Sequence, residues 1–191
     1  MQQNECGLPL GAEDRVMGRE DLVAILAALP RARFSGVDFS GADLSRLDLT
    51  GCVFEKCLLA KTNLTGAMLE LTHWFKCKGA QAKFPAAKLA DAVFEGSDFN
   101  NADFQRTGLS ETVFSGCKLT GANFAGASAM SMVFKQCLLN GASLPKWSFF
   151  KSTVDELDLS DADLSGADFR EAVFSGGTLS GPRLAGAGLE R

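Results

Sequence analysis

Six cysteines and one histidine are the side chains of this chain that could carry nucleophilic, redox or metal chemistry. Such chemistry needs several of them close together, because zinc takes three or four protein ligands and a nucleophile needs a neighbouring base. The histidine, His73, has no Ser or Cys partner at a recognisable spacing. The chain also holds no Cys-x-x-Cys pair, no His-Glu-x-x-His segment and no glycine-rich phosphate loop. The sequence therefore predicts no catalytic residue, no metal and no cofactor.

The length and the charge of the chain limit the classes of protein that remain. The chain has 191 residues and a formal net charge of −4, so we expect one domain and no direct binding to nucleic acid, which requires clustered Lys and Arg. No apolar run approaches the roughly 18 to 20 residues of a membrane span. Residues 1–10 lack the basic and apolar regions of a secretory signal. These features favour a cytoplasmic protein without a membrane partner.

A large apolar residue recurs at every fifth position from Phe34 to Leu189, always in the same frame. Of the 32 positions in this frame, 28 are Phe or Leu, and the exceptions are Trp74, Gly79, Ala129 and Val154. A period of five fits neither a helix of 3.6 residues per turn nor a strand of period two. The chain must therefore turn a corner in every unit to keep one side chain pointing inward.

The residues around each central Phe or Leu complete the repeat. The residue two positions earlier is usually small and the one between is often Asp or Asn, which gives the unit A-D/N-L/F-x-x. Thirteen of the 20 glycines lie two residues after the central position, where a corner favours an unhindered backbone. On segments such as GADLS, GANFA, SDADLSGADF and TGCVF, the chain resembles the bacterial pentapeptide-repeat family over about residues 32–189.

That resemblance implies an all-β solenoid, a right-handed quadrilateral β-helix with four pentapeptides in each 20-residue coil. About eight coils would then occupy residues 31–191, with the central residue and the small residue two before it pointing inward. Folding the sequence by 20 places an almost continuous aromatic ladder on one face: Phe34, Phe54, Trp74, Phe94, Phe114, Phe134, Val154 and Phe174. Offset stacking of rings suits strands stacked in this way.

Five of the six cysteines fall on small inward positions. They are Cys52, Cys57, Cys77, Cys117 and Cys137. We predict that they fill the core rather than form disulfides or bind metal, because free Cys behaves as a small apolar residue and parallel stacked side chains do not reach disulfide geometry. Only Cys6, which precedes the repeat, is expected to be accessible, and His73 is expected to be a solvated surface residue.

The N-terminal segment predicts a lid. Leu22, Ile25, Leu26 and Leu29 have the i, i+3, i+4, i+7 spacing of a one-sided helix, which Pro30 stops. We expect residues 19–30 to form a helix that caps the first coil, and residues 1–18 to be flexible.

The C-terminal coil is expected to stay open, because the repeat runs to Leu189 and the sequence shows no capping helix after it. An open end exposes unpaired strand edges and apolar core. We therefore predict a homodimer that meets end to end through the last coil, around Leu179, Leu184 and Leu189.

Acidic residues concentrate in the seventh coil, residues 154–173. The candidate acidic partner surface consists of Asp155, Glu156, Asp158, Asp161, Asp163, Asp168 and Glu171. A charge of this size can steer a basic partner. The alternative is that Asp in this repeat only solvates and braces the turns.

A second candidate surface is apolar. It comprises Met130 and Phe150, which occupy the same outward position in adjacent coils, and a cluster of Met68, Leu71 and Phe75 near the second and third coils. Exposed apolar groups can mark partner sites. The alternative is that these side chains fold back over local irregularities at Gly79 and Ala129.

Three functions fit the sequence, and none is enzymatic, because a filled solenoid offers no cavity for convergent catalytic groups. We favour a protein-binding scaffold acting through the outer surface. The resemblance implies an alternative, since some relatives in the family confer quinolone resistance by mimicking DNA and docking on gyrase, although Lys78, Lys83 and Lys88 interrupt the negative charge that such mimicry needs. A component or effector of a bacterial secretion system is the second alternative.

Overall fold

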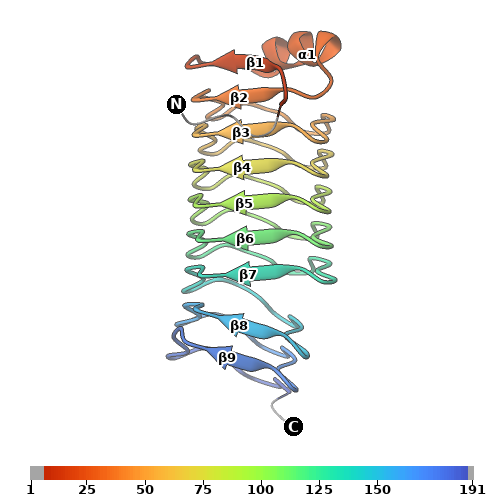
Figure 1. The fold of residues 1–191 in the computed structure, drawn as a ribbon. Coiled ribbons are helices and arrows are strands. Elements are labelled where there is room, and N and C mark those ends of the chain that lie inside the picture. Colours follow the sequence, from red (N-terminus) through yellow and green to blue (C-terminus); the bar gives the residue numbers. More distant parts are fainter. Residues whose placement is uncertain (1–6, 189–191) are drawn as a thin grey trace.

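The computed structural model describes residues 7–188 and forms a parallel β-solenoid of about eight coils (Figure 1). Nine short strands build one sheet in chain order, and a single helix, α1 (Arg19–Ala28), precedes the second strand. The strands are β1 (Leu10–Glu13), β2 (Arg33–Ser35), β3 (Val53–Glu55), β4 (His73–Phe75), β5 (Val93–Glu95), β6 (Val113–Ser115), β7 (Val133–Lys135), β8 (Thr153–Asp155) and β9 (Val173–Ser175). The predicted β-helix is confirmed.

Each coil contains 20 residues, as the register of the strands shows. Phe34 pairs with Phe54, and Phe54 with Trp74, in parallel. The other three faces are joined by single parallel bridges with the same spacing, such as Asp38 to Leu58. We number the coils from Phe34, so that coil one is residues 34–53. The first face carries β2 to β9, and the second, third and fourth faces follow it along the chain.

Aromatic rings fill the interior in stacked columns. On the first face the ring centroids of Phe54 and Trp74 lie 4.1 Å apart, and those of Phe94 and Phe114 lie 4.5 Å apart with an interplanar angle of 11°. A second column crosses the first edge-on, as in the contact of Phe84 with Trp74 at 6.2 Å and 85°. Both geometries are favoured for aromatic pairs, so the predicted ladder is confirmed.

The corners combine a left-handed backbone with side-chain bracing. Gly41 has φ of 71°, which glycine adopts at little cost, but the equivalent residue of the next coil, Lys61, has φ of 58°. Beside many corners a side chain supplies the missing acceptor, as where Asp38 Oδ1 accepts a hydrogen bond of 2.8 Å from the Ser40 amide. This turn chemistry of Asp explains the Asp or Asn that precedes the central residue.

The N-terminal residues are more ordered than the sequence predicted. Residues 10–13 form β1, which pairs in parallel with β2, and the chain continues the pairing at Val16 and Asp38. The prediction of a flexible segment over residues 1–18 is therefore wrong for residues 10–17, because the first coil offers an open strand edge that backbone of almost any sequence can pair with. Residues 1–6, including Cys6, lie outside the described residues.

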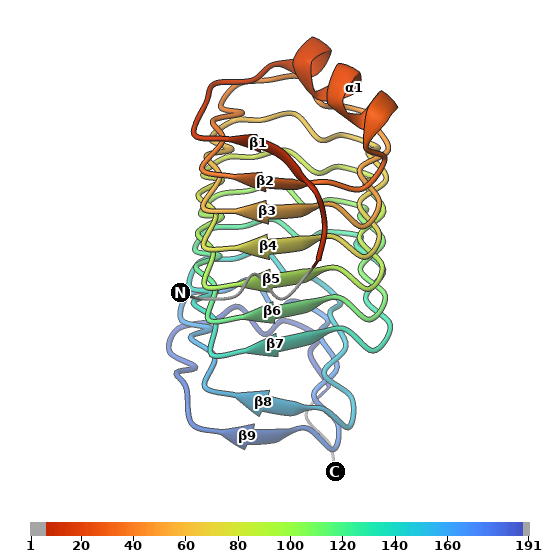
Figure 2. The same cartoon turned by 45° about the horizontal axis from the view of Figure 1, so that its top comes forward.

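Helix α1 lies over the open end of the first coil (Figure 2). Leu22 is fully buried in the core, and Ile25, Leu26 and Leu29 pack against it, as the one-sided pattern predicted. The Arg19 guanidinium donates a hydrogen bond of 2.8 Å to the Ser45 carbonyl, which ties the start of the helix to coil one. The helix ends at Ala28 rather than at residue 30.

Candidate functional site: the outer surface of the β-helix

The cysteines lie in the interior, where they bond to the backbone. Cys52, Cys57, Cys77, Cys117 and Cys137 are free and buried. Four of them donate a thiol hydrogen bond to the carbonyl 23 residues earlier, as Cys77 does to Phe54 at 3.2 Å. The Ser97 hydroxyl makes the same bond, to the Trp74 carbonyl at 3.0 Å. The prediction that these residues fill the core is confirmed.

Burial limits access to these thiols, and the pKa shifts differ between them: the hydrogen bond with Cys117 lowers the pKa of Cys137. Burial raises the pKa of the Cys52 thiol, and the neighbouring Cys57 together with burial raises the pKa of Cys77. The histidine lies elsewhere, on the outer side of the first face, with its Nε2 atom 3.5 Å from the Glu95 carboxylate. Within residues 7–188, no three His, Cys, Asp or Glu side chains are placed to hold a metal ion.

The acidic residues of coil seven encircle the rod instead of forming one patch. Asp155 lies on the first face, and Asp158, Asp163 and Asp168 lie on the second, third and fourth. Glu156, Asp161 and Glu171 occupy corners with left-handed φ values. A flat partner would therefore contact only one or two of the seven carboxylates at a time, whereas a partner that wraps the rod would meet the whole acidic belt.

Several carboxylates of this belt already have partners. Asp168 receives two side-chain hydrogen bonds from the Arg170 guanidinium, at 2.7 and 2.8 Å. These bonds and the Arg170 amide lower the pKa of Asp168 to about 2. Glu171 lies 3.7 Å from the Lys151 ammonium, and Glu156 accepts a hydrogen bond from Gln136. The bracing role weighed for these aspartates is thus present in the structure, whatever else they bind.

Charge is arranged in belts across the rod axis, not in stripes along it. On the second face the parallel bridges run through Asp38, Leu58, Lys78, Asp98, Lys118, Leu138 and Asp158. Coil three presents Lys78, Lys83 and Lys88 on three successive faces, which makes a basic belt. A DNA duplex has a continuous negative surface along its axis. The faces of the rod that carry Lys78, Lys83 and Lys88 have no such continuous negative surface.

The structure divides the candidate apolar surface into two places. Met68 lies on the fourth face, three coils before the equivalent residue Ser128. The cluster of Met68, Leu71 and Phe75 is therefore well away from Met130 and Phe150. Leu71 is 55% exposed, while Met68 and Phe75 are half-buried. Met130 is the most exposed of the five, at 75%. Phe150 is 42% exposed, and the Lys151 ammonium lies 5.0 Å from its ring centre.

The last coil leaves apolar core side chains uncovered. Phe174 and Leu179 occupy central positions of the repeat but are 46% and 45% exposed, and Leu184 is half-buried. The equivalent side chains one coil earlier, Val154 and Leu159, are buried. Leu189, also predicted for this end, lies outside the described residues.

Sequence reasoning missed one feature, an open seam between two successive turns of the helix. β7 and β8 share a single pair, Lys135 with Asp155, where every other neighbouring pair of strands shares three (Figure 1). The preceding fourth face lacks its bridge as well. We define the seam as the stretch where residues 126–134 face residues 145–154. The last backbone hydrogen bond before the seam runs from the Phe124 amide to the Ser143 carbonyl. The first one after it runs from the Gln136 amide to the Asp155 carbonyl.

Five backbone amides border the seam without a hydrogen bond. In the coil below, the amides of Leu109 and Glu111 donate to the carbonyls of residues 128 and 130. The equivalent bonds from Ala129 and Ser131, and also that from Gly126, are absent among the described residues. From the opposite edge the amides of Ser148 and Thr153 likewise have no partner in the described part of the chain. Both edges therefore direct unpaired donors into the seam.

A pair of irregular core residues explains the opening. Residue 147 belongs to a column of small inward residues that holds Ala in coils on either side, but here it is Trp. Its indole packs against Phe124 and Phe134, with centroid distances of 5.6 and 5.7 Å. Ala129 lines the same cavity as Trp147, and it is small where the same central position holds Leu in the four preceding coils. An indole where alanine is expected keeps the two turns from closing into hydrogen-bonding distance.

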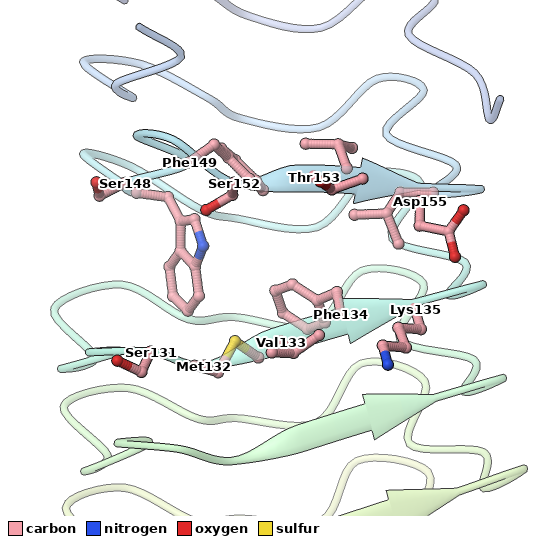
Figure 3. A pocket seen from close by; sticks show the side chains of 13 residues that line it. Ser131, Met132, Val133, Phe134, Lys135, Ser148, Phe149, Ser152, Thr153 and Asp155 are labelled. Atoms are coloured by element: carbon pink, nitrogen blue, oxygen red, sulfur yellow. The ribbon is translucent and has the colours of Figure 1, made fainter. Parts of the chain in front are cut away.

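The seam is hollowed. One cavity of about 590 Å³ is lined by Ser131, Met132, Val133, Phe134, Lys135, Trp147, Ser148, Phe149, Ser152, Thr153, Val154, Asp155 and Leu157 (Figure 3). An adjoining cavity of about 800 Å³ extends the opening along the fourth face past Met130 and Phe150. Figure 3 shows Ser131, Met132 and Val133 on one turn facing Ser148, Ser152 and Thr153 on the next. Pockets of this size are typical of ligand sites.

Comparisons with known proteins place the chain in a family. The model described as pentapeptide repeat region matches residues 27–104 and 68–144, and the model described as pentapeptide repeats (8 copies) matches residues 155–190. A search of curated protein sequences finds no match. Among the described residues, no helix has the length and apolar character needed to cross a membrane.

The comparison with solved structures finds similar chains, one of which shares the fold with a TM-score above 0.5. A trypsin-treated variant of QnrB1, a plasmid-mediated fluoroquinolone resistance protein, is 23% identical, with a TM-score of 0.59 over 82% of this chain and 91% of that one. HetL, involved in heterocyst differentiation regulation in the cyanobacterium Nostoc sp. strain PCC 7120, is 24% identical over 82% of this chain and 73% of that one, with a TM-score of 0.43. The family models match more than half of the sequence, and they show that the chain belongs to the pentapeptide-repeat family.

Proposed function

We propose that this protein is a non-catalytic scaffold that binds a partner protein through the outer surface of its β-helix. The observation that carries the proposal is the exposure of Met130 and Phe150 beside the open seam. Apolar side chains held at a hollow are typical of binding hot spots. Neither His73 nor any of the five repeat cysteines lines either of the two cavities of the seam.

Affinity capture from the host followed by binding of the purified partner tests this proposal. We expect a partner whose affinity falls at least tenfold for the double variant Met130→Glu, Phe150→Glu. Leu58→Glu is the matched control, because Leu58 is also exposed and apolar but lies on the second face of coil two. Equal loss for both variants, or no partner at all, contradicts the proposal.

A DNA mimic that modulates gyrase is the second candidate. The acidic belt of coil seven supports it, as does the similarity in fold to a fluoroquinolone resistance protein. The basic belt of Lys78, Lys83 and Lys88 opposes it. Purified protein should alter supercoiling by gyrase at micromolar concentration, with an effect that weakens as salt rises. Unchanged supercoiling and unchanged quinolone sensitivity would remove this candidate.

The exposed last coil supports a further element of the proposal, a homodimer formed end to end. Phe174 and Leu179 would be buried between two copies related by a two-fold axis, with the two α1 helices at the outer tips. A cytoplasmic location and a role beside a secretion system stay predictions from the sequence.

A further inference from the structure

We propose that the seam is a binding slot for one extended, apolar segment of a partner polypeptide, which completes the interrupted β-ladder between the two turns. This inference rests on the proposed scaffold function and names its site and the kind of ligand. It is distinct from binding at the acidic belt or at the last coil.

The hydrogen-bonding pattern of the slot determines the class of ligand. The amides of Ala129 and Ser131 face it from one turn, and those of Ser148 and Thr153 face it from the next. The carbonyls that would have accepted from Ser148 and Thr153, those of Ala127 and Met132, border it too. The backbone of a ligand can pair with such unpaired donors and acceptors on two facing edges, as in β-strand addition.

The walls of the slot define the side chains that fit it. Met132, Phe134, Trp147 and Phe149 contribute apolar surface to the inner cavity, while Met130 and Phe150 flank the outer one. An extended strand directs alternate side chains to opposite sides. The ligand should therefore carry apolar residues at alternate positions, so that these side chains point into the cavity.

The departure of the sequence from the regular repeat at the seam also supports the slot. The family repeat could have closed the seam with Leu at residue 129 and Ala at residue 147, as in neighbouring coils. The matches to the family models also stop at residue 144 and resume at residue 155, so the repeat signature lapses where the seam lies.

Selection from a displayed library of random ten-residue peptides tests the slot. We expect peptides with alternating apolar residues to be enriched on the wild type. Bound peptide should slow hydrogen exchange of the Ala129, Ser131 and Thr153 amides at least tenfold, while the already paired amides of Leu109 and Glu111 should not change. The selected peptide with N-methylated backbone should lose at least tenfold in affinity, because its side chains remain but its donors are gone.

A closed variant supplies the matched control. Ala129→Leu combined with Trp147→Ala restores the residues of the regular repeat, so the seam should close and peptide affinity should fall at least tenfold. If this variant does not fold, the N-methylated peptide and the exchange data decide alone. Equal binding to a folded closed variant, no enriched peptide, or unchanged amide exchange overturns the slot. Protection of these amides in the free protein that rises with concentration would make the occupant a second copy and would also overturn it.

The two proposals fail separately. A natural partner that binds the closed variant as tightly as the wild type leaves the scaffold function standing and removes the slot. Loss of the natural partner with the closed variant, together with the exchange result, supports both.

Discussion

The ring of Phe99 occupies the space that a side chain on Gly79 would need: a Cβ atom added to Gly79 would collide with the ring. Phe99 is fully buried and stands edge-on to Trp74 at 6.2 Å. The two residues lie in successive coils on the second face, so the large ring compensates for the missing side chain below it. The break in the repeat at Gly79 is therefore filled and leaves no hollow comparable to the seam.

Gly79→Leu should destabilise the protein although Leu is the commonest residue of the repeat frame. Overpacking of a filled core costs about 1–3 kcal/mol, and thermal unfolding should show the loss. Adding Phe99→Leu should recover part of it, since contacting residues couple by about 0.5–3 kcal/mol. Strictly additive effects of the two changes would show that Phe99 does not fill this space.

Phe114→Asp should unfold or severely destabilise the chain, because it buries an unpaired carboxylate in the aromatic ladder. The expected loss is roughly 3–5 kcal/mol in the free energy of unfolding. Ser115→Asp is the control, since Ser115 lies on the same strand but points outward. A Phe114→Asp protein that melts within a degree or two of the wild type would disprove the assigned frame.

Alkylation should separate the cysteines by burial. The five core thiols should react at least a hundredfold more slowly in native protein than in denaturant, because all five are buried and four of them donate hydrogen bonds to carbonyls. Cys6 is predicted to react at once. Mass spectrometry of the labelled peptides distinguishes them, and rapid native labelling of all six would contradict the core assignment.

Stability should fall at acid pH through the bracing aspartates. Hydrogen bonds from the Arg170 side chain and amide lower the pKa of Asp168 to about 2, and bonds from Ser165 lower that of Asp163. A depressed carboxyl pKa contributes stability above the unfolded value of about 3.9, which is lost as the pH falls toward the folded value. The melting temperature should therefore decline between about pH 4 and pH 2. Asp168→Asn should reduce that decline, whereas a decline unchanged by this substitution would assign it to other groups.

The open end predicts a dimer that one charge can disrupt. Leu179→Glu should shift the mass measured by light scattering from dimer toward monomer, because it places a carboxylate in the surface that two last coils would bury. Leu58→Glu, far from this end, should leave the mass unchanged. A wild type that stays monomeric at high concentration would contradict the end-to-end arrangement.

Much of the fold could be predicted because every unit of the sequence repeat imposes the same constraint, one large apolar side chain that must point inward. A period of five with Phe or Leu at the centre admits a single arrangement of inward and outward residues, so the aromatic ladder and the buried cysteines followed directly from the frame. Helix α1 was also predicted from a local pattern, because the spacing of its apolar residues places them on one side of a helix. β1 was not, because its pairing with β2 uses backbone groups, and these leave no mark in the side-chain pattern.

The sequence by itself determined the repeat frame and the identity of the core, because those depend on a local pattern that recurs 32 times, while the 20-residue coil followed from the resemblance to the family. Only the tertiary structure decided how the outer residues group. It spread the seven acidic residues of coil seven around four faces, and it separated Met68 from Met130. It also brought Ala129 and Trp147, which lie in successive coils, to the lining of one cavity between the two turns. The seam depends on the volumes of side chains and on the distance between two successive coils. A periodic pattern along the chain does not predict either quantity.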